Sequence, residues 1–175
     1  MKNSALLVID AQYAIVEQKD FSIQLEKISA LIEKFLSKGN EVIFVKHLNF
    51  VDKESKFYFE NEHSPNLCLD HGNNKVFVKS KPNAFSSPDL CKHLQDKGIN
   101  ELVIVGFNTE FCCMFTAIVA EHLGYSVALI EDACGTVNDD TVYEMPGLNI
   151  NDFVGTVLDW SGTIQVLYFD EFLEG

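Results

Sequence analysis

The chain has 175 residues, of which 47% are hydrophobic and 11% aromatic, enough for a single domain with a sizeable core. Its formal net charge of −13 repels phosphate backbones and anionic lipid headgroups, which makes nucleic acids and membranes poor candidate partners. All thirteen basic residues are lysines, so no arginine can clamp an anionic substrate through two parallel hydrogen bonds.

Short apolar segments typical of strands alternate with segments of helical periodicity along the chain. In chain order, the patterns predict a strand over 5–9, a helix over 21–38, strands over 41–46 and 75–79, a helix over 88–97, a strand over 102–105, a helix over 110–123, a strand over 126–130, a helix over 151–160 and a strand over 163–168. The second helix has Ser87 as its expected N-cap and Pro88 at its first position.

Strands that alternate with helices pair in parallel through right-handed crossovers, and strands that are apolar throughout are typical of a sheet covered on both faces. We therefore predict one α/β domain over 1–175, with three α/β/α layers around a six-stranded, mostly parallel, Rossmann-like sheet. The segment 48–74 does not fit this alternation because it is long, polar and aromatic, and loops of this length are often functional.

The first apolar run, 5–9, stops at Asp10 and is too short for the core of a signal peptide or for a membrane span. The five cysteines are an odd number and lack the paired spacing of a zinc site. Both observations favour a reduced, cytoplasmic protein.

Three reactive side chains fall where a parallel sheet binds its ligands, at the carboxyl ends of the strands. Asp10 directly follows the first strand, Lys79 ends the third, and Cys112 lies in the first turn of the helix after the fourth. Taken alone, Asp10 could simply cap a loop, Lys79 could be a solvated charge, and Cys112 could be a small buried residue. Their coincidence at one edge of the sheet predicts an active site.

The position of Cys112 has a chemical consequence. A helix N-terminus carries unpaired amides and partial positive charge, so this position and the Lys79 ammonium should both lower the pKa of the thiol. Asp10 could then take the thiol proton and later activate water against a thioester. The arrangement suits acyl transfer from an amide or an ester.

Four blocks resemble the signatures of the isochorismatase-like cysteine hydrolases, in the order and at the spacing of that family. The block 106–116 (GFNTEFCCMFT) resembles G-x-x-T-x-x-C-V-x-x-T, and 5–12 (ALLVIDAQ) resembles L-L-V-I-D-x-Q. The block 79–85 (KSKPNAF) is similar to K-x-x-x-S-A-F, with Asn83 in place of Ser, and 124–135 (GYSVALIEDACG) is similar to G-Y-x-V-x-x-x-x-D-A-x.

The resemblance implies a small-molecule hydrolase without a cofactor that forms dimers or tetramers. It places the family's aspartate at Asp10, its lysine at Lys79 and its nucleophile at Cys112. Cys113 occupies the position usually held by Val and is expected to be a packing residue. Family members that cleave isochorismate typically have glycine at the position of the cysteine, so Cys112 argues for amide hydrolysis instead.

A thioester pathway passes through an oxyanion, which needs preorganised donors. No side-chain donor is obvious beside Cys112, so we expect the backbone amides of Cys112 and Asn108 to serve. In the proteins that this chain resembles, a cis peptide without proline precedes the cysteine. By register, that bond falls between Phe107 and Asn108.

Nicotinamidases of this superfamily bind a metal through a D-x-H motif and a further histidine after the second strand. In this chain His47 has no aspartate two residues before it. The donors that follow are His63, Cys68, Asp70 and His71, and their spacing fits no zinc pattern. We therefore expect no metal, although a nicotinamidase-like, metal-assisted amidase stays an alternative.

The aromatic residues Phe57, Tyr58 and Phe59 either line the substrate pocket or pack the loop or an interface between subunits. Two other functions also stay open. A thiol-redox protein could use Cys112 and Cys113, although neighbouring helical residues point about 100° apart, which strains a disulfide. A binding module on the same scaffold is the third possibility.

Overall fold

The computed structural model describes residues 3–174. Its centre is a six-stranded sheet in the order β3-β2-β1-β4-β5-β6, in which every neighbouring pair is parallel. The strands are β1 (Ser4–Ile9), β2 (Glu41–His47), β3 (Lys75–Lys79), β4 (Glu101–Phe107), β5 (Ser126–Gly135) and β6 (Ile164–Leu167). All six predicted strands are confirmed, and the sheet is entirely parallel.

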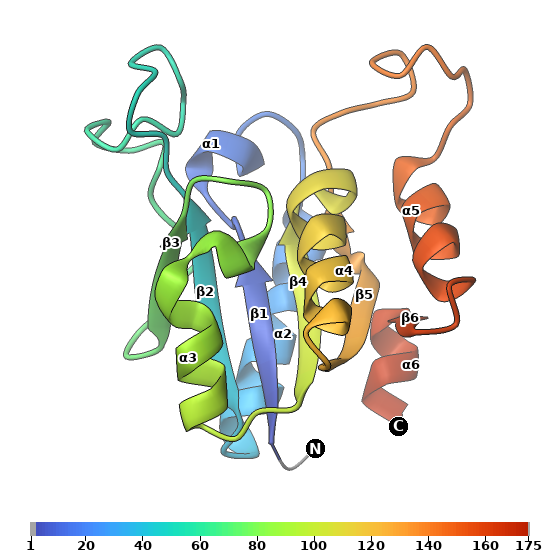
Figure 1. Cartoon of the computed structure of the whole chain (residues 1–175). Coiled ribbons are helices and arrows are strands. Elements are labelled where there is room, and N and C mark those ends of the chain that lie inside the picture. The colour runs from blue at the N-terminus through green and yellow to red at the C-terminus, as the bar shows by residue number, and fades with distance from the viewer. Residues whose placement is uncertain (1–2, 175) are drawn as a thin grey trace.

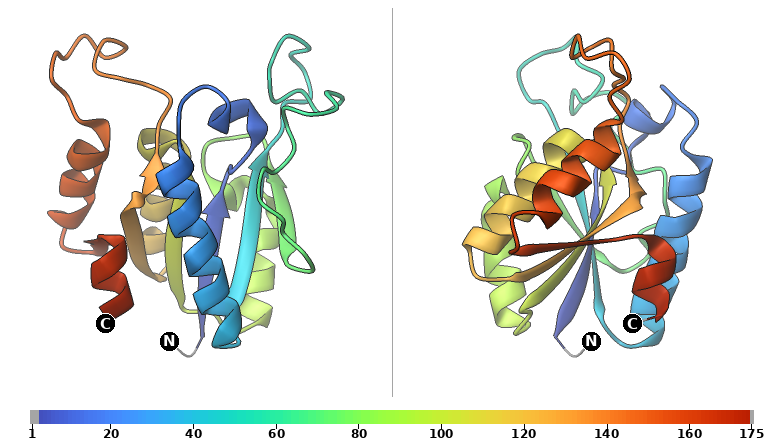
Figure 2. Two further views of the ribbon diagram at one scale, coloured as in Figure 1. Left: turned by 180° about the vertical axis from the view of Figure 1, so that it is seen from behind. Right: turned by 90° about the vertical axis from the view of Figure 1, so that its right-hand side faces the viewer.

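Helices cover both faces of the sheet (Figure 1, Figure 2). One face carries α3 (Pro88–Asp96), α4 (Met114–His122) and α5 (Ile150–Asp159), and the other carries α2 (Ser22–Ser37) and α6 (Phe169–Glu174). The predicted three-layer architecture is confirmed. The sequence patterns missed α6, the short α1 (Tyr13–Val16) and the 3-10 turn η1 (Ala84–Ser86).

The central strands supply two separate hydrophobic cores. In β1, Leu7 and Ile9 pack towards α3, α4 and α5, whereas Leu6 and Val8 pack towards α2 and α6, and all four are fully buried. This double burial explains why the strands are apolar without alternation. Across residues 3–174, no helix combines the length and the apolar character that crossing a membrane requires.

The winding of the chain reverses between β1 and β4. From β1 the chain moves outward to β2 and β3, and it then returns to build β4, β5 and β6 on the other side. The loops after β1 and β4 diverge at such a point and leave a crevice for ligands. Gly106 in β4 has a φ of 122°, and a Cβ there would lie 2.0 Å from the carbonyl oxygen of Ile9. Glycine therefore allows the two strand ends to approach closely at this crevice.

Two long loops extend from the carboxyl edge of the sheet (Figure 1). The first, 48–74, joins β2 to β3, as the sequence predicts, and the second, 136–149, joins β5 to α5. The first loop is tied to the segment after β1, because the Tyr13 N–H donates to the Asn66 carbonyl at 3.1 Å and the Cys68 N–H to the Ala11 carbonyl at 2.9 Å. It is therefore fixed beside the end of β1.

Glu131 in β5 is a buried carboxyl that packs against α5. A Cβ added at Gly155 of α5 would lie 2.0 Å from its Oε2. Burial, followed by the hydrogen bond and the charge of Asp152, raises the pKa of Glu131 to about 7, and the hydroxyl of Tyr168 opposes this. Between about pH 4 and about pH 7, Glu131 therefore keeps its proton in the native protein but releases it in the unfolded chain.

We expect Glu131→Gln to stabilise the protein at neutral and alkaline pH but not at about pH 4. The folded-state pKa lies above the value of about 4.3 for an unfolded glutamate, so wild-type stability falls as the pH rises from about 4 to about 7. The variant has no such loss, and its Tm should exceed the wild-type Tm by at least about 2 °C at about pH 8 and equal it at about pH 4. Thermal unfolding at the two pH values measures the difference, and a difference independent of pH would contradict the expectation.

Candidate active site

The structure brings the three predicted residues together at the switch point of the sheet. Asp10 follows β1, Lys79 is the last residue of β3, and Cys112 lies in the turn between β4 and α4. The Lys79 ammonium joins the other two, because its Nζ lies 2.6 Å from Oδ2 of Asp10 and 3.2 Å from Sγ of Cys112. The neighbouring Lys81 is exposed, whereas Lys79 is buried.

Asp10 has a backbone conformation that residues other than glycine rarely adopt, with a φ of 49°. Its N–H donates to the Val45 carbonyl of β2 at 2.9 Å, and its side chain is 1% exposed. Oδ2 is bound to Lys79, whereas Oδ1 accepts no hydrogen bond from any residue in 3–174. Backbone strain of this kind concentrates at functional sites, and a carboxylate with one oxygen fixed and one open is suited to accepting a proton.

The protonation states of the site follow from its burial. Burial disfavours the charge of Lys79, but Asp10 and Cys112 outweigh it and raise the pKa of Lys79, which keeps the ammonium charged at neutral pH. The expectation of a lowered pKa for Cys112 is wrong. Burial and then the charge of Asp10 raise the pKa of the thiol to about 12, against the opposing effect of Lys79. The resting nucleophile is therefore a thiol, which needs a base.

Cys112 lies on a wide, π-helical turn, η2 (Thr109–Cys113), rather than on the first turn of a regular α-helix. Turns of this type are frequent at functional sites. Cys112 is half-buried and contacts Lys79, whereas Cys113 is fully buried beside Cys134. The two neighbouring cysteines therefore face different surroundings, which supports the packing role of Cys113 and weighs against a redox pair.

Phe107 and Asn108 connect β4 to η2. The peptide bond between Phe107 and Asn108 is cis, which confirms the prediction. The Asn108 carbonyl accepts hydrogen bonds from the N–H groups of Phe111 and Cys113, both at 3.2 Å, and its Oδ1 accepts from the N–H of Val137 at 3.1 Å. The loop after β5 is thereby joined to the turn that carries the nucleophile.

Gln12, in the first motif, is fully buried and joins β2 to the long loop. Its Oε1 accepts a hydrogen bond from the His47 N–H at 2.8 Å, and its Nε2 donates to the carbonyls of His47 at 3.0 Å and Pro65 at 2.7 Å. These three hydrogen bonds join the end of β2 to the loop 48–74 beside Asp10.

Asn83 and Thr116, in two other motifs, connect η1 to α4. Asn83 caps η1, because its Oδ1 accepts a hydrogen bond from the Phe85 N–H at 2.8 Å. Serine fills the same capping role, which explains why Asn is tolerated where the motif has Ser. Thr116 accepts a hydrogen bond from the Ala84 N–H at 3.0 Å. Ser87 is the N-cap of α3 and Pro88 its first residue, as predicted, although the Ser87 hydroxyl forms no capping bond within 3–174.

Glu110, two residues before the nucleophile, is buried and binds the loop 136–149 to η2. Its Oε1 accepts hydrogen bonds from Thr136 Oγ1 at 2.8 Å, Asn138 Nδ2 at 2.7 Å and the Tyr143 hydroxyl at 3.0 Å. The sequence patterns gave Glu110 no role, because an acidic residue in the first turn of a helix is usually solvated.

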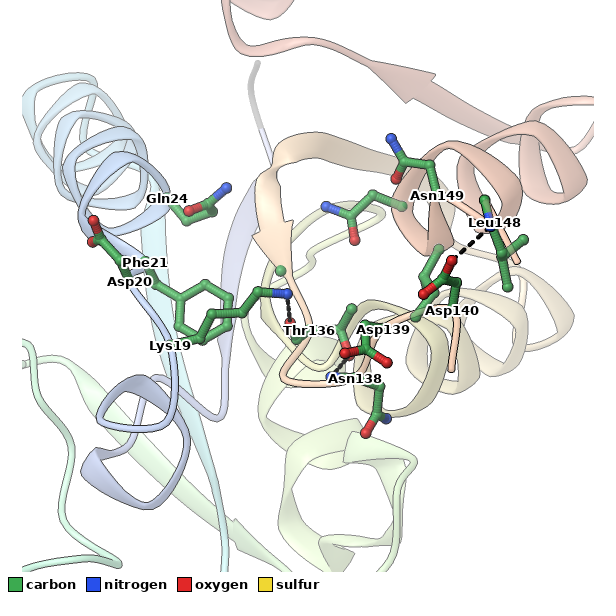
Figure 3. A pocket seen from close by; sticks show the side chains of 14 residues that line it. Lys19, Asp20, Phe21, Gln24, Thr136, Asn138, Asp139, Asp140, Leu148 and Asn149 are labelled. Atoms are coloured by element: carbon green, nitrogen blue, oxygen red, sulfur yellow. Dashed lines mark hydrogen bonds between the residues drawn. The ribbon is translucent and has the colours of Figure 1, made fainter. Parts of the chain in front are cut away.

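A polar pocket of about 480 Å³ borders the other side of that loop (Figure 3). Its walls come from the residues around the start of α2, from the loop 136–149 and from the start of α5. Lys19 reaches across towards Thr136, with 3.4 Å between its Nζ and the Thr136 carbonyl oxygen. Neither Asp10 nor Cys112 lines this pocket, so it is separate from the candidate reaction centre.

The three aromatic residues predicted to bind substrate have different surroundings, although the rings of Tyr58 and Phe59 pack edge to face with centroids 5.0 Å apart. Phe57 lies next to the site, with its ring centroid 5.2 Å from that of His47 in an edge-to-face contact. Tyr58 is buried within the loop, and Phe59 is exposed and packs on Phe50. Substrate contact stays a prediction for all three, and the geometry favours Phe57.

The candidate metal donors do not converge. His63 pairs with Glu17 at 2.8 Å and stacks on Tyr13, and His71 lies against Phe44. Within residues 3–174, no three His, Cys, Asp or Glu side chains gather closely enough to hold a metal ion. The four candidate donors of the sequence therefore do not come together as one group in the structure.

Comparison with known proteins gives the same assignment as the fold and the motifs. A model of the isochorismatase domain matches residues 4–161. The isochorismatase family protein YddQ of Bacillus subtilis (strain 168) is 30% identical over 142 residues, which cover 76% of this chain and 78% of that protein. The ureidoacrylate amidohydrolase RutB of Agrobacterium fabrum (strain C58) is 30% identical over 90 residues, 50% of this chain and 40% of that protein.

The structural comparison extends the likeness over almost the whole chain. The crystal structure of the nicotinamidase from Staphylococcus aureus superposes with a TM-score of 0.75, over 95% of this chain and 98% of that one. At 20% identity, this match shows a shared fold alone. Since the domain model and the relative YddQ each cover most of the chain, the protein belongs to the isochorismatase family of hydrolases.

Proposed function

We propose that the protein is a cysteine amidohydrolase that cleaves the C–N bond of a small amide through a thioester on Cys112. The observation that carries this proposal is the Lys79 ammonium, which contacts a buried carboxylate and a thiol at once. One similar protein, the ureidoacrylate amidohydrolase RutB, supports an amide rather than an ester as the substrate.

In the acylation step, Sγ of Cys112 attacks the carbonyl carbon while its proton passes to Asp10. With a pKa of about 12, the thiol is protonated at rest, so proton transfer accompanies the attack. Lys79 stabilises the sulfur as negative charge develops on it. The backbone amides of Asn108 and Cys112 are the proposed donors to the oxyanion. When the tetrahedral intermediate collapses, Asp10 returns the proton to the nitrogen and the amine leaves.

In the deacylation step, Asp10 accepts a proton from water, which attacks the thioester carbon. Collapse breaks the S–C bond, releases the acid and returns the proton from Asp10 to the sulfur. The net reaction consumes one amide and one water and yields an acid and an amine or ammonia. This cycle requires the open Oδ1 of Asp10, since Oδ2 is bound to Lys79 throughout.

A screen of small primary amides, carbamoyl compounds and nicotinamide, with ammonia release as the readout, tests the proposal. We expect the wild type to hydrolyse at least one of them, with or without a metal chelator, and Cys112→Ala to hydrolyse none. Activity that is lost on chelation and restored by zinc or iron would favour a nicotinamidase-like enzyme. Turnover that persists without Cys112 would rule out the thioester.

We further propose that the protein acts in the cytoplasm as a homo-oligomer. Two stripes with helical spacing are exposed on the same face of the sheet: Phe111, Phe115 and Ile118 along η2 and α4, and Phe153, Val157 and Trp160 along α5. Phe111 neighbours the nucleophile, so a second copy seated on this face would adjoin the active site. Light scattering should show a dimer or larger assembly that Phe115→Asp dissociates.

A further inference from the structure

Lys79 has three N–H donors, and Asp10 and Cys112 accept two of them. The third lies opposite His47, whose Nδ1 is 3.3 Å from Nζ. An ammonium can only donate, so Nδ1 must be the lone-pair nitrogen and the ring proton must sit on Nε2. A hydrogen bond between the ring and the Lys81 backbone adds a further contact.

The surrounding protein fixes the His47 ring in place. The N–H and the carbonyl of His47 both bind the side chain of Gln12, at 2.8 and 3.0 Å. Phe57 covers the ring edge to face at 5.2 Å. Contacts on the backbone and on the face of the ring therefore orient His47, and its Nδ1 lies 3.3 Å from the ammonium.

We propose that His47 is a positioning residue of the active site, whose Nδ1 holds the Lys79 ammonium where it contacts both Asp10 and Cys112. The inference rests on the proposed amidohydrolase function and adds one member to its site. His47 itself exchanges no proton with the substrate. Its role is to complete the hydrogen bonds of a buried cation, since a buried N–H without an acceptor would draw the ammonium away from the sulfur.

The role requires a neutral ring. The groups that face it are the Lys79 ammonium, the Asp10 carboxylate and the Lys81 backbone. Burial and then the charge of Lys79 lower the pKa of His47, and Asp10 and Lys81 oppose this. Protonation would remove the acceptor and place two cations in contact. Acid should therefore inactivate the enzyme through protonation of His47.

The first test needs no substrate and uses the imidazole nitrogen signals of the full-length protein in NMR. We expect neutral wild-type His47 to carry its proton on Nε2. We also expect the pKa of His47 to rise by at least about one unit in Lys79→Met, because the nearby cation is removed. The exposed His63, which pairs with Glu17, should not change and serves as the control. A proton on Nδ1, or an unchanged His47 pKa, would overturn the proposal.

The second test compares His47→Phe, which keeps a ring but has no acceptor, with His47→Asn, whose Oδ1 lies near the position of Nδ1. We expect His47→Phe to lower kcat at least about tenfold with KM within about twofold, and His47→Asn to restore most of the loss. His63→Asn is the matched control. Below the His47 pKa measured by NMR, His47→Asn should also retain a larger fraction of its kcat than the wild type.

Unchanged kcat in His47→Phe would overturn the positioning role, and a loss confined to KM would assign His47 to substrate contact instead. Failure of the proposed function has a different signature, namely an active Cys112→Ala variant or no amide hydrolysis at all. In that case the tautomer and the coupling between His47 and Lys79 still decide whether the contact exists.

Discussion

Replacement of Cys112 by alanine should abolish amide hydrolysis and lower kcat by at least about 10⁴-fold, the scale on which hydrolases lose activity without their nucleophile. The loss should appear in kcat because the variant retains the surfaces that bind substrate but cannot form the thioester. The side chain of Cys112 is half-buried and contacts the buried Lys79, so a smaller residue should change the fold little. Steady-state kinetics on the best amide from the screen, with circular dichroism to verify folding, measures the effect.

The neighbouring cysteine provides the matched control. Cys113 is fully buried beside Cys134 and does not face Lys79, so Cys113→Ala should lower Tm while leaving kcat within about threefold. Equal losses of kcat in both variants, with both folded, would show that packing of η2 rather than chemistry at Cys112 limits the rate.

Most of the fold follows from the sequence because the strands are apolar throughout and the helices carry clear stripes. The errors occur where the local pattern is weak. Phe169–Glu174 forms α6 although it is short and rich in acidic residues, because Phe172 packs into the core under α2. β5 continues to Gly135 through Glu131 and Asp132, whose charges interrupt the apolar run. Tertiary contacts that the pattern does not contain stabilise both segments.

The candidate site was predictable where a residue's position in the sheet and its chemistry coincide. Asp10 directly follows β1, Lys79 ends β3, and Cys112 lies in η2, between β4 and α4. His47 also ends a strand, β2, which lies between the strands of Asp10 and Lys79, so the same argument could have found it. The sequence motifs indicated His47 only as a possible metal ligand. Burial around Cys112, which raises its pKa, depends on how the layers close and could not be predicted from spacing.

Asp10→Asn and Lys79→Met should each lower kcat at least about a hundredfold, the usual effect of removing a positioned proton-transfer group. Asn cannot take the thiol proton, and Met cannot donate to the sulfur or hold the carboxylate. The two side chains are 1% and 0% exposed, so each single change also leaves a buried charge without its partner. We therefore expect Lys79→Met to cost about 3–5 kcal/mol of unfolding free energy. Denaturant unfolding must accompany the kinetics.

The double variant separates a shared site from two independent ones. Because Lys79 acts through Asp10 and Cys112, the combined loss of kcat should be far smaller than the product of the single losses. The free energy of unfolding should be coupled as well, because Asp10→Asn removes the buried charge that Lys79→Met leaves unpaired. The double variant should therefore unfold at a higher denaturant concentration than Lys79→Met alone. Fully multiplicative kinetic losses in folded variants, together with additive losses of stability, would mean that the ion pair and the nucleophile do not work as one unit. The 2.6 Å contact would then be a structural feature of the sheet edge rather than part of the reaction.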